Sequence, residues 1–122
     1  MRIYVAHSRG FNFQEELYAP LRQSHLNQEH TITLPHEKSE ESFNTKEAIR
    51  NKYDLLIAEV SYPSTGLGIE LGWADSFNIP IIGVYKKNSK VSSSIKSLTK
   101  NLIEYSNPEE LIQKIEDLLN KA

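Results

Sequence analysis

Residues 53–74 read YDLLIAEVSYPSTGLGIELGWA, and the order of residue types in this stretch decides the fold. The run Leu55-Leu56-Ile57-Ala58 is continuously apolar, as expected of a strand that is buried on both faces of a parallel sheet. A polar, glycine-containing segment follows, and residues 67–77 then carry apolar side chains at helical spacing. A buried strand, a loop and a helix in succession predict one unit of a parallel α/β sheet.

The same alternation recurs on both sides of this stretch. Apolar runs predict four further strands, at residues 3–6, 31–34, 79–85 and 102–105. Helical spacing predicts helices at residues 13–26, 44–52 and 92–100, and a last helix that begins at Pro108 behind an Asn107 N-cap. The resulting order βαβαβαβαβα predicts an α/β, flavodoxin-like three-layer sandwich whose five-stranded parallel sheet has the order 2-1-3-4-5.

Composition limits the classes of function. The chain has 122 residues, which fits a single domain over 1–122, and it contains no cysteine, which excludes disulfides and thiol chemistry. A net charge of −2 argues against binding to nucleic acid or to an anionic membrane. No apolar run is long enough to cross a membrane, so we expect a cytoplasmic protein. The histidines lack the spacing of metal ligands, and we expect neither a metal nor another cofactor.

The fold class predicts where a ligand binds. In open α/β sheets, ligands lie beyond the carboxyl ends of the strands, at the switch point between the first and third strands. This rule selects residues 7–10 and residues 61–70. Gly66 and Gly68, at the expected start of a helix, let a ligand approach the backbone, and the helix N–H groups there favour an anion. The segment departs from the G-x-G-x-x-G pattern and follows the third strand, so it does not predict a dinucleotide site.

Two acidic residues in this stretch need an explanation. Glu70 is expected in the first turn of the helix, where it either complements the helix dipole, stabilising the fold by roughly 0.3–1 kcal/mol, or serves as a nucleophile that the positive helix end keeps ionised. Glu59 lies in an otherwise apolar strand and is costly to bury without partners, so we interpret it as structural.

Residues 53–74 resemble the signature of the nucleoside 2-deoxyribosyltransferase superfamily, and within it the 2′-deoxynucleoside 5′-monophosphate N-hydrolase branch. The shared pattern is D-hydrophobic-A-E-V-S-x-P-S-x-G-x-G-x-E-L-G-x-A. The first strand, the strand after Pro80 and the serine-rich segment after Lys90 agree in order. The superfamily has a flavodoxin-like fold, which agrees with the element order derived above. The resemblance implies an enzyme that cleaves N-glycosidic bonds.

The resemblance implies roles for the catalytic residues. Glu70 matches the glutamate that attacks the anomeric carbon and forms a glycosyl-enzyme intermediate, and Tyr4 matches a tyrosine beside it. The aspartate that the family usually carries before the third strand, often credited with protonating the leaving base, is replaced by Lys46. Either Glu47 takes that role after a shift of one residue, or the role is lost. His7 is another candidate because histidine titrates near neutral pH, and the alternative for His7 is an exposed loop residue.

The resemblance also implies a phosphate site. Ser64 stands where the monophosphate hydrolases have a phosphate-binding serine and the nucleoside transferases an aspartate. Ser8 matches a second such serine, and Ser93 a third that is reached across a dimer interface. With the backbone around Gly66 and Gly68, these hydroxyls suit a 5′-phosphate. We therefore expect a small-molecule nucleotide or nucleoside as substrate and a homodimer or higher homo-oligomer.

Three functions remain open at this point. The first is cleavage of the N-glycosidic bond of (2′-deoxy)nucleoside 5′-monophosphates, and the second is transfer of deoxyribose between bases. The third is a nucleotide-binding sensor without turnover, which the replacement at Lys46 favours. A flavin-binding or receiver domain of the same fold is disfavoured, since the first loop lacks a hydroxyl-rich phosphate loop and the third strand ends without a receiver aspartate.

Overall fold

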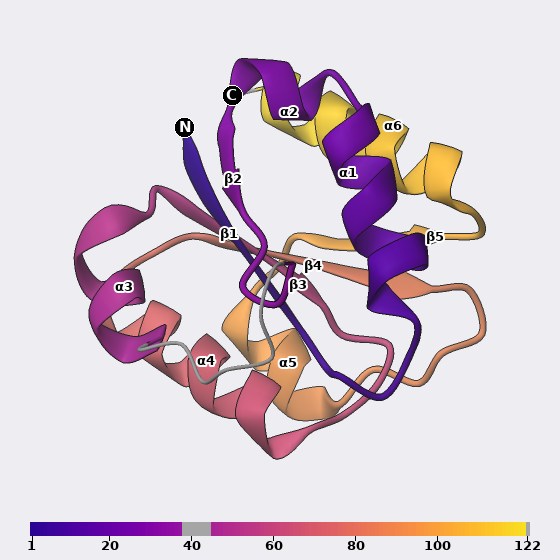
Figure 1. Cartoon of the computed structure of the whole chain (residues 1–122). Coiled ribbons are helices and arrows are strands. Elements are labelled where there is room, and N and C mark those ends of the chain that lie inside the picture. The colour runs from indigo at the N-terminus through magenta and orange to yellow at the C-terminus, as the bar shows by residue number, and fades with distance from the viewer. Residues whose placement is uncertain (38–44, 122) are drawn as a thin grey trace.

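The computed structural model describes residues 1–37 and 45–121, and their core is a fully parallel five-stranded sheet (Figure 1). The strand order is β2-β1-β3-β4-β5, and each neighbouring pair is parallel. The predicted fold class and strand order are confirmed. The strands are β1 (Arg2–His7), β2 (Thr31–Thr33), β3 (Leu55–Glu59), β4 (Ile81–Lys86) and β5 (Leu102–Tyr105).

Helices cover both faces of the sheet and produce two apolar cores (Figure 1). Strand β1 supplies side chains to both cores, because successive residues of a strand point to opposite faces. Ile3 and Val5 belong to the first core, and Tyr4 and Ala6 belong to the second. The first core is covered by the π-helical turn η1 (Gln14–Tyr18), α1 (Ala19–Gln23), α2 (Leu26–Glu29) and α6 (Pro108–Asn120). The second is covered by α3 (Thr45–Lys52), α4 (Thr65–Ser76) and α5 (Ser93–Leu98).

The single helix expected at residues 13–26 is replaced by three short elements. Pro20 explains the first break, because its nitrogen carries no hydrogen for the helix ladder. The N–H of Ala19 bonds instead to the carbonyl of Gln14, five residues back, which is the π-helical spacing. Ser24 ends α1 in an extended conformation, and its hydroxyl donates to the carbonyl of Leu21 over 2.7 Å.

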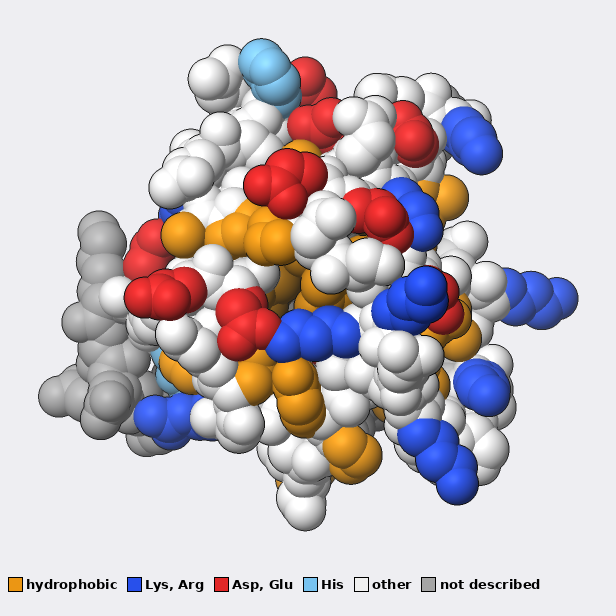
Figure 2. Space-filling model, turned by 90° about the vertical axis from the view of Figure 1, so that its right-hand side faces the viewer, with side chains coloured by type: hydrophobic (Ala, Val, Ile, Leu, Met, Phe, Trp, Pro, Cys, Tyr) orange, Lys and Arg blue, Asp and Glu red, His pale blue; other side chains and the backbone are white. Residues whose placement is uncertain are grey.

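The other helices lie close to their predicted positions. Asn107 caps α6 as expected, and its side chain accepts from the N–H of Glu110 over 2.8 Å. Helix α4 begins at Thr65, two residues before the expected start, because Ser64 caps it. None of the described helices is both long and apolar enough to cross a bilayer. Figure 2 shows acidic and basic side chains together on the face formed by α1 and α6, as a net charge of −2 leads one to expect.

Candidate active site

The candidate site lies at the carboxyl edge of the sheet, where β1 ends at His7 and β3 ends at Glu59. These strands are neighbours, and His7 is paired with Glu59 in the register of the sheet. The β1–η1 loop (residues 8–13) and the β3–α4 loop (residues 60–64) therefore start side by side. The predicted switch-point location is thus where the structure brings the two candidate segments together.

Glu70 is the sixth residue of α4 and lies in its second turn, which corrects the expectation that it belongs to the first. The dipole interpretation is therefore wrong, since the effect falls off within the first turn of a helix. Burial raises the pKa of Glu70 to about 7, and a hydrogen bond from Tyr4 opposes that rise. The carboxyl group is thus only partly ionised near neutral pH, in contrast to the expected fully ionised carboxylate.

One oxygen of the Glu70 carboxyl group has no hydrogen-bond partner within residues 1–37 and 45–121. Its Oε2 atom is buried and has no hydrogen-bond partner among the described residues. A buried carboxyl oxygen of this kind loses its hydration without compensation, which is the physical cause of the raised pKa. The arrangement leaves an acceptor that a ligand atom can use.

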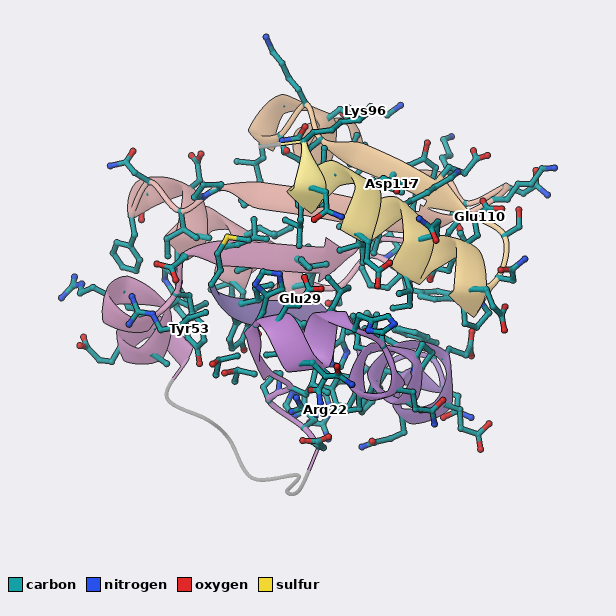
Figure 3. The ribbon with its side chains drawn as sticks, turned by 90° about the horizontal axis from the view of Figure 1, so that it is seen from above. Arg22, Glu29, Tyr53, Lys96, Glu110 and Asp117 are labelled. Carbon is teal, nitrogen blue, oxygen red and sulfur yellow. The ribbon has the colours of Figure 1, made fainter. Side chains whose placement is uncertain are left out.

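Tyr4 is brought together with Glu70, as the sequence predicts. Its side chain is 1% exposed and lies on the α4 side of β1. The ring of Tyr53, which follows α3 (Figure 3), meets the Tyr4 ring edge-on, with centroids 5.3 Å apart. The packing fixes the ring of Tyr4, and the Tyr4 hydroxyl donates to the Glu70 carboxylate.

His7 is the buried last residue of β1, so the interpretation as an exposed loop histidine is wrong. Its Nδ1 lies 2.8 Å from the carbonyl oxygen of Ser8, which can only accept, so Nδ1 carries the hydrogen. Its Nε2 lies 2.5 Å from the Tyr18 hydroxyl, which therefore donates, and that hydroxyl accepts from the N–H of His36. Burial lowers the pKa of His7 to about 4. The imidazole is neutral at pH 7, and both nitrogens are engaged within the protein.

Ser64 forms the N-cap of α4, and its Oγ accepts from the N–H of Leu67 over 3.2 Å. The N–H of Gly68 donates to the Ser64 carbonyl over 3.1 Å. The N–H groups of Leu67 and Gly68 therefore donate to Ser64 rather than to an anion. The N–H groups of Thr65 and Gly66, at the helix start, are left for a ligand. A Cβ added at Gly66 or at Gly68 would meet no atom of the described chain, so nothing within this chain demands glycine there.

The other two predicted serines lie in different settings. Ser8 is 6% exposed, and its Oγ accepts from the N–H of Gly10 over 3.1 Å, which leaves its hydroxyl hydrogen free to donate. Ser93 is exposed at the start of α5. It lines an open hollow of about 590 Å³ together with Pro63, the neighbour of Ser64, and with Lys90 and Lys96. Lys96 is at the outer edge of the molecule on α5 (Figure 3).

Glu47 is exposed on α3, and its carboxylate lies 3.7 Å from the guanidinium of Arg50. Arg50 in turn stacks over the ring of Phe77, 5.1 Å from its centroid. The ion pair of Glu47 is therefore made with a residue of its own helix, α3. Lys46 is also exposed. Part of the polar segment before α3, residues 38–44, lies outside the described residues.

Glu59 has the structural role expected of it. The side chain is fully buried, and its oxygens accept from the N–H of Ser61 over 2.6 Å and from the hydroxyl of Tyr105. Burial and the neighbouring Glu59 carboxylate raise the pKa of Tyr105 far above its usual range. The pair ties the end of β3 to the end of β5.

The sequence analysis missed a group of residues beside the two loops. Tyr62 and Phe11 stack with ring centroids 4.8 Å apart, and the ammonium group of Lys86 contacts both rings and the Glu16 carboxylate. Tyr62 lies within residues 53–74, and its aromatic side chain in a predicted ligand loop could have marked it as a candidate. The partners Phe11, Glu16 and Lys86 carried no such signal, since they come from three other segments. Among the described residues, no group of acidic and histidine side chains is arranged to hold a metal ion.

Comparisons with known proteins give relatives of two kinds, although no family model matches the chain. A protein of Syntrophotalea carbinolica is 56% identical over 32 residues, which are 26% of this chain and 22% of that protein. A protein of Thermofilum pendens is 35% identical over 71 residues, which are 54% of this chain and 50% of that protein. Both are named "Putative 2'-deoxynucleoside 5'-phosphate N-hydrolase 1". The matches therefore span half or less of the relatives' length.

Two solved structures share the fold over nearly the whole chain. A CMP N-glycosidase of Clostridium botulinum superposes with a TM-score of 0.67 at 24% identity, covering 95% of this chain and 99% of that one. A conserved protein from Enterococcus faecalis superposes with a TM-score of 0.72 at 18% identity, covering 97% and 98%. At these identities the likeness shows the fold alone. The names of the two sequence relatives confirm the predicted resemblance to the N-hydrolase branch, and the solved structures add the shared fold.

Proposed function

We propose that the protein hydrolyses the N-glycosidic bond of 2′-deoxynucleoside 5′-monophosphates, with Glu70 as nucleophile. The observation that carries this proposal is the buried Glu70 carboxyl group, held by the Tyr4 hydroxyl and with Oε2 unpartnered. The two sequence relatives named as 2′-deoxynucleoside 5′-phosphate N-hydrolases and the fold shared with a CMP N-glycosidase support it.

The proposed reaction has two steps that return the carboxylate to its starting state. A Glu70 oxygen attacks C1′ of the deoxyribose as the C1′–N bond breaks, and the bonding electrons leave with the base, which takes up a proton. Water then attacks C1′ of the glycosyl ester and loses a proton to solvent, which balances the proton that the base took from solvent. The C1′–O bond to Glu70 breaks, and 2-deoxyribose 5-phosphate is released. Both transition states carry positive charge on the sugar, which a nearby carboxylate stabilises.

The environment of Glu70 suits both steps. A pKa of about 7 leaves a substantial ionised fraction at neutral pH, and the desolvated carboxylate is a stronger nucleophile than one in water. The Tyr4 hydroxyl donates a hydrogen bond to the carboxyl group and so limits its rotation in the proposed site. The same hydrogen bond stabilises the carboxylate when it leaves the ester in the second step.

Two loops and a helix start supply groups for the 5′-phosphate. The hydroxyls of Ser8 and Ser64 each have a hydrogen to donate, and the open amides of Thr65 and Gly66 add the helix dipole. In the proposed site Ser64 donates to the phosphate while its Oγ keeps accepting from Leu67. Lys90 and Lys96 line the adjoining hollow and favour an anion there.

The contacts of His7 and Glu47 argue against either residue as the group that protonates the leaving base. His7 is neutral near pH 7 and uses both nitrogens internally, and Glu47 is exposed and paired with Arg50. In the proposed site His7 therefore shapes the edge of β1 rather than transferring a proton. Its hydrogen bond to the Ser8 carbonyl fixes the first residue of the β1–η1 loop.

The single domain and the homodimer are also parts of the proposal. In the proposed dimer, Ser93 reaches the phosphate site of the other copy, whereas within one chain Ser93 and Pro63 line the same hollow. Ile69 supports an interface on α4, since it is 48% exposed and lies next to Glu70 in the chain.

Chromatography after incubation with the eight common ribo- and deoxyribonucleoside 5′-monophosphates tests the proposed function. Free base and 2-deoxyribose 5-phosphate are the expected products. A second base added to the mixture separates hydrolysis from transfer, because a transferase forms a new nucleotide from it. The matching nucleosides are incubated in parallel. No base release from any nucleotide or nucleoside would favour the sensor, and release from the nucleosides alone would favour the transferase.

A further inference from the structure

Lys86, the last residue of β4, holds the β3–α4 loop at two points. Its backbone N–H donates to the Oγ of Ser61 over 2.7 Å, and its Nζ donates to the hydroxyl of Tyr62 over 2.9 Å. The Nζ also donates to a carboxylate oxygen of Glu16 in η1. One lysine thus connects the end of a central strand, a candidate ligand loop and the first helical turn.

Phe11 brings the β1–η1 loop into the same group. Its ring stacks on Tyr62 at 4.8 Å with an angle of 24° between the planes. The Nζ of Lys86 lies 5.4 Å from the centroid of Phe11 and 5.2 Å from that of Tyr62, within the range of cation–π contacts. We call Phe11, Glu16, Tyr62 and Lys86 the Lys86 clamp.

The clamp lies close in the chain to the serines of the proposed phosphate site. Ser8 precedes Phe11 by three residues, and Ser64 follows Tyr62 by two. A change in the clamp therefore shifts both loops that carry the two hydroxyls. Glu70 and Tyr4 are not members of the clamp; they belong to α4 and β1, and Tyr4 packs in the second core.

We propose that Lys86 is a positioning residue that sets the affinity for the 5′-phosphate by holding the β1–η1 and β3–α4 loops against each other. The proposal rests on the proposed function, since it assigns the two loops to the phosphate. The Lys86 ammonium group acts through Tyr62 and Phe11 rather than on the phosphate, because its charge is balanced by Glu16 and two of its hydrogens are in use.

Four variants separate positioning from direct binding. Lys86→Met removes the ammonium group and keeps an unbranched apolar side chain, while Lys86→Arg keeps a charged donor. Tyr62→Phe removes only the hydroxyl that Lys86 contacts and leaves the ring stack. Lys87→Met changes the exposed neighbour and is the matched control. Calorimetry with 2-deoxyribose 5-phosphate measures affinity without depending on the base, and steady-state kinetics of base release gives KM and kcat.

If Lys86 acts through Tyr62, removing either the ammonium group or the tyrosine hydroxyl should have the same effect. Lys86→Met and Tyr62→Phe should each weaken binding of 2-deoxyribose 5-phosphate about tenfold, and the double variant should be no weaker than Lys86→Met. KM should rise while kcat stays within about twofold, since binding is lost and the reacting groups are untouched. Lys86→Arg and Lys87→Met should resemble the wild type.

Two results would overturn the proposal. Wild-type affinity in Tyr62→Phe beside weak binding in Lys86→Met means that the lysine touches the phosphate directly. A fall in kcat at unchanged KM means that the clamp serves the chemical step instead.

Hydrogen exchange distinguishes failure of the clamp from failure of the proposed function. If the wild type does not bind 2-deoxyribose 5-phosphate, the proposed substrate class is wrong and the assignment of the loops to a phosphate falls with it. Lys86→Met should nevertheless speed amide exchange in residues 8–13 and 61–64 if the clamp holds the loops. Unchanged exchange in both segments would show that Lys86 does not position them.

Discussion

The hydroxyl of Tyr4 in β1 donates a hydrogen bond to the carboxylate of Glu70 in α4. The contact joins the sheet to the helix that covers it, beside the apolar side chains of Ala6 and Leu71. Burial raises the pKa of the carboxyl group to about 7, and the hydrogen bond limits that rise. Such an acid destabilises the folded chain whenever it is ionised, as functional groups in active sites commonly do.

Glu70→Gln should stabilise the protein at alkaline pH. The folded-state pKa of about 7 lies above the usual glutamate pKa of 4.5, so the folded state binds an extra proton between these two pH values. The contribution of the Glu70 carboxyl group to the free energy of unfolding is fully present below about pH 4.5 and is lost as the pH rises through 7. Glutamine keeps the shape and acceptor without the charge, so the variant should exceed the wild type by about 2–3 kcal/mol at pH 8.

Urea unfolding of both proteins at pH 4.5 and pH 8 measures this difference. At pH 4.5 the two curves should nearly coincide, since the wild-type carboxyl group is then mostly protonated in the folded state. Equal stability at pH 8 would mean that the Glu70 carboxyl group is not desolvated as the structure shows.

His7 produces the opposite pH dependence. Its folded-state pKa of about 4 lies below the usual histidine pKa of 6.5, so its contribution to stability is present above pH 6.5 and is lost as the pH falls toward 4. His7→Leu should lower stability at pH 7 by about 1–3 kcal/mol, because the Tyr18 hydroxyl and the Ser8 carbonyl lose their partner. The gap between variant and wild type should narrow at pH 5, and a gap that widens there would contradict the neutral, buried imidazole.

Ser64→Asp should change ligand preference without changing the fold. Aspartate is as good an N-cap as serine, so it can keep the hydrogen bond from Leu67. Its charge repels a 5′-phosphate, whereas each serine hydrogen bond to the phosphate is worth roughly 1.5–3 kcal/mol. The wild type should bind a deoxynucleoside monophosphate at least about tenfold more tightly than its nucleoside.

Calorimetry on one nucleotide and its nucleoside compares wild type and Ser64→Asp, with thermal unfolding as the check on the fold. The variant should lose the preference at an unchanged melting temperature. Equal affinities in the wild type would show that the phosphate site is misassigned and would favour the transferase.

The homodimer leads to a prediction about mass and about Ser93. Light scattering should give at least twice the 14.0 kDa of one chain, and Ser93→Ala should weaken nucleotide binding at unchanged mass. Mixing Ser93→Ala with Glu70→Gln subunits should restore some sites with both residues intact. An active, strictly monomeric protein would rule out a shared site.

The parallel sheet could be predicted from sequence because its strands are continuous apolar runs, such as Leu55–Ala58, separated by helical patterns. The order of strands followed from the number of these units and the handedness of their connections. The interruption of the helix expected at residues 13–26 was not apparent from periodicity alone. Pro20 changes the hydrogen bonding of one turn while the apolar spacing of Leu17 and Leu21 stays helical.

The candidate site was predictable only in part, for a similar reason. Tyr4 and Glu70 could be paired through the resemblance, but the ionisation of Glu70 depends on burial, which no local pattern records. The depression of the His7 pKa likewise arises from burial, with His36 and Arg9 adding to it. The Lys86 clamp joins three regions that are far apart in the chain, around Phe11 and Glu16, Tyr62 and Lys86, so only the folded arrangement reveals it.

Release of base from deoxynucleoside monophosphates by wild type and by Glu70→Gln tests the central claim most directly. Both proteins are incubated with each of the four deoxynucleotides, and free base is measured by chromatography beside calorimetric binding of the same compounds. We predict release by the wild type and a loss of at least about a thousandfold in Glu70→Gln, with binding retained, because only the attacking charge is removed. Base release by Glu70→Gln at the wild-type rate would contradict the assignment of Glu70 as nucleophile.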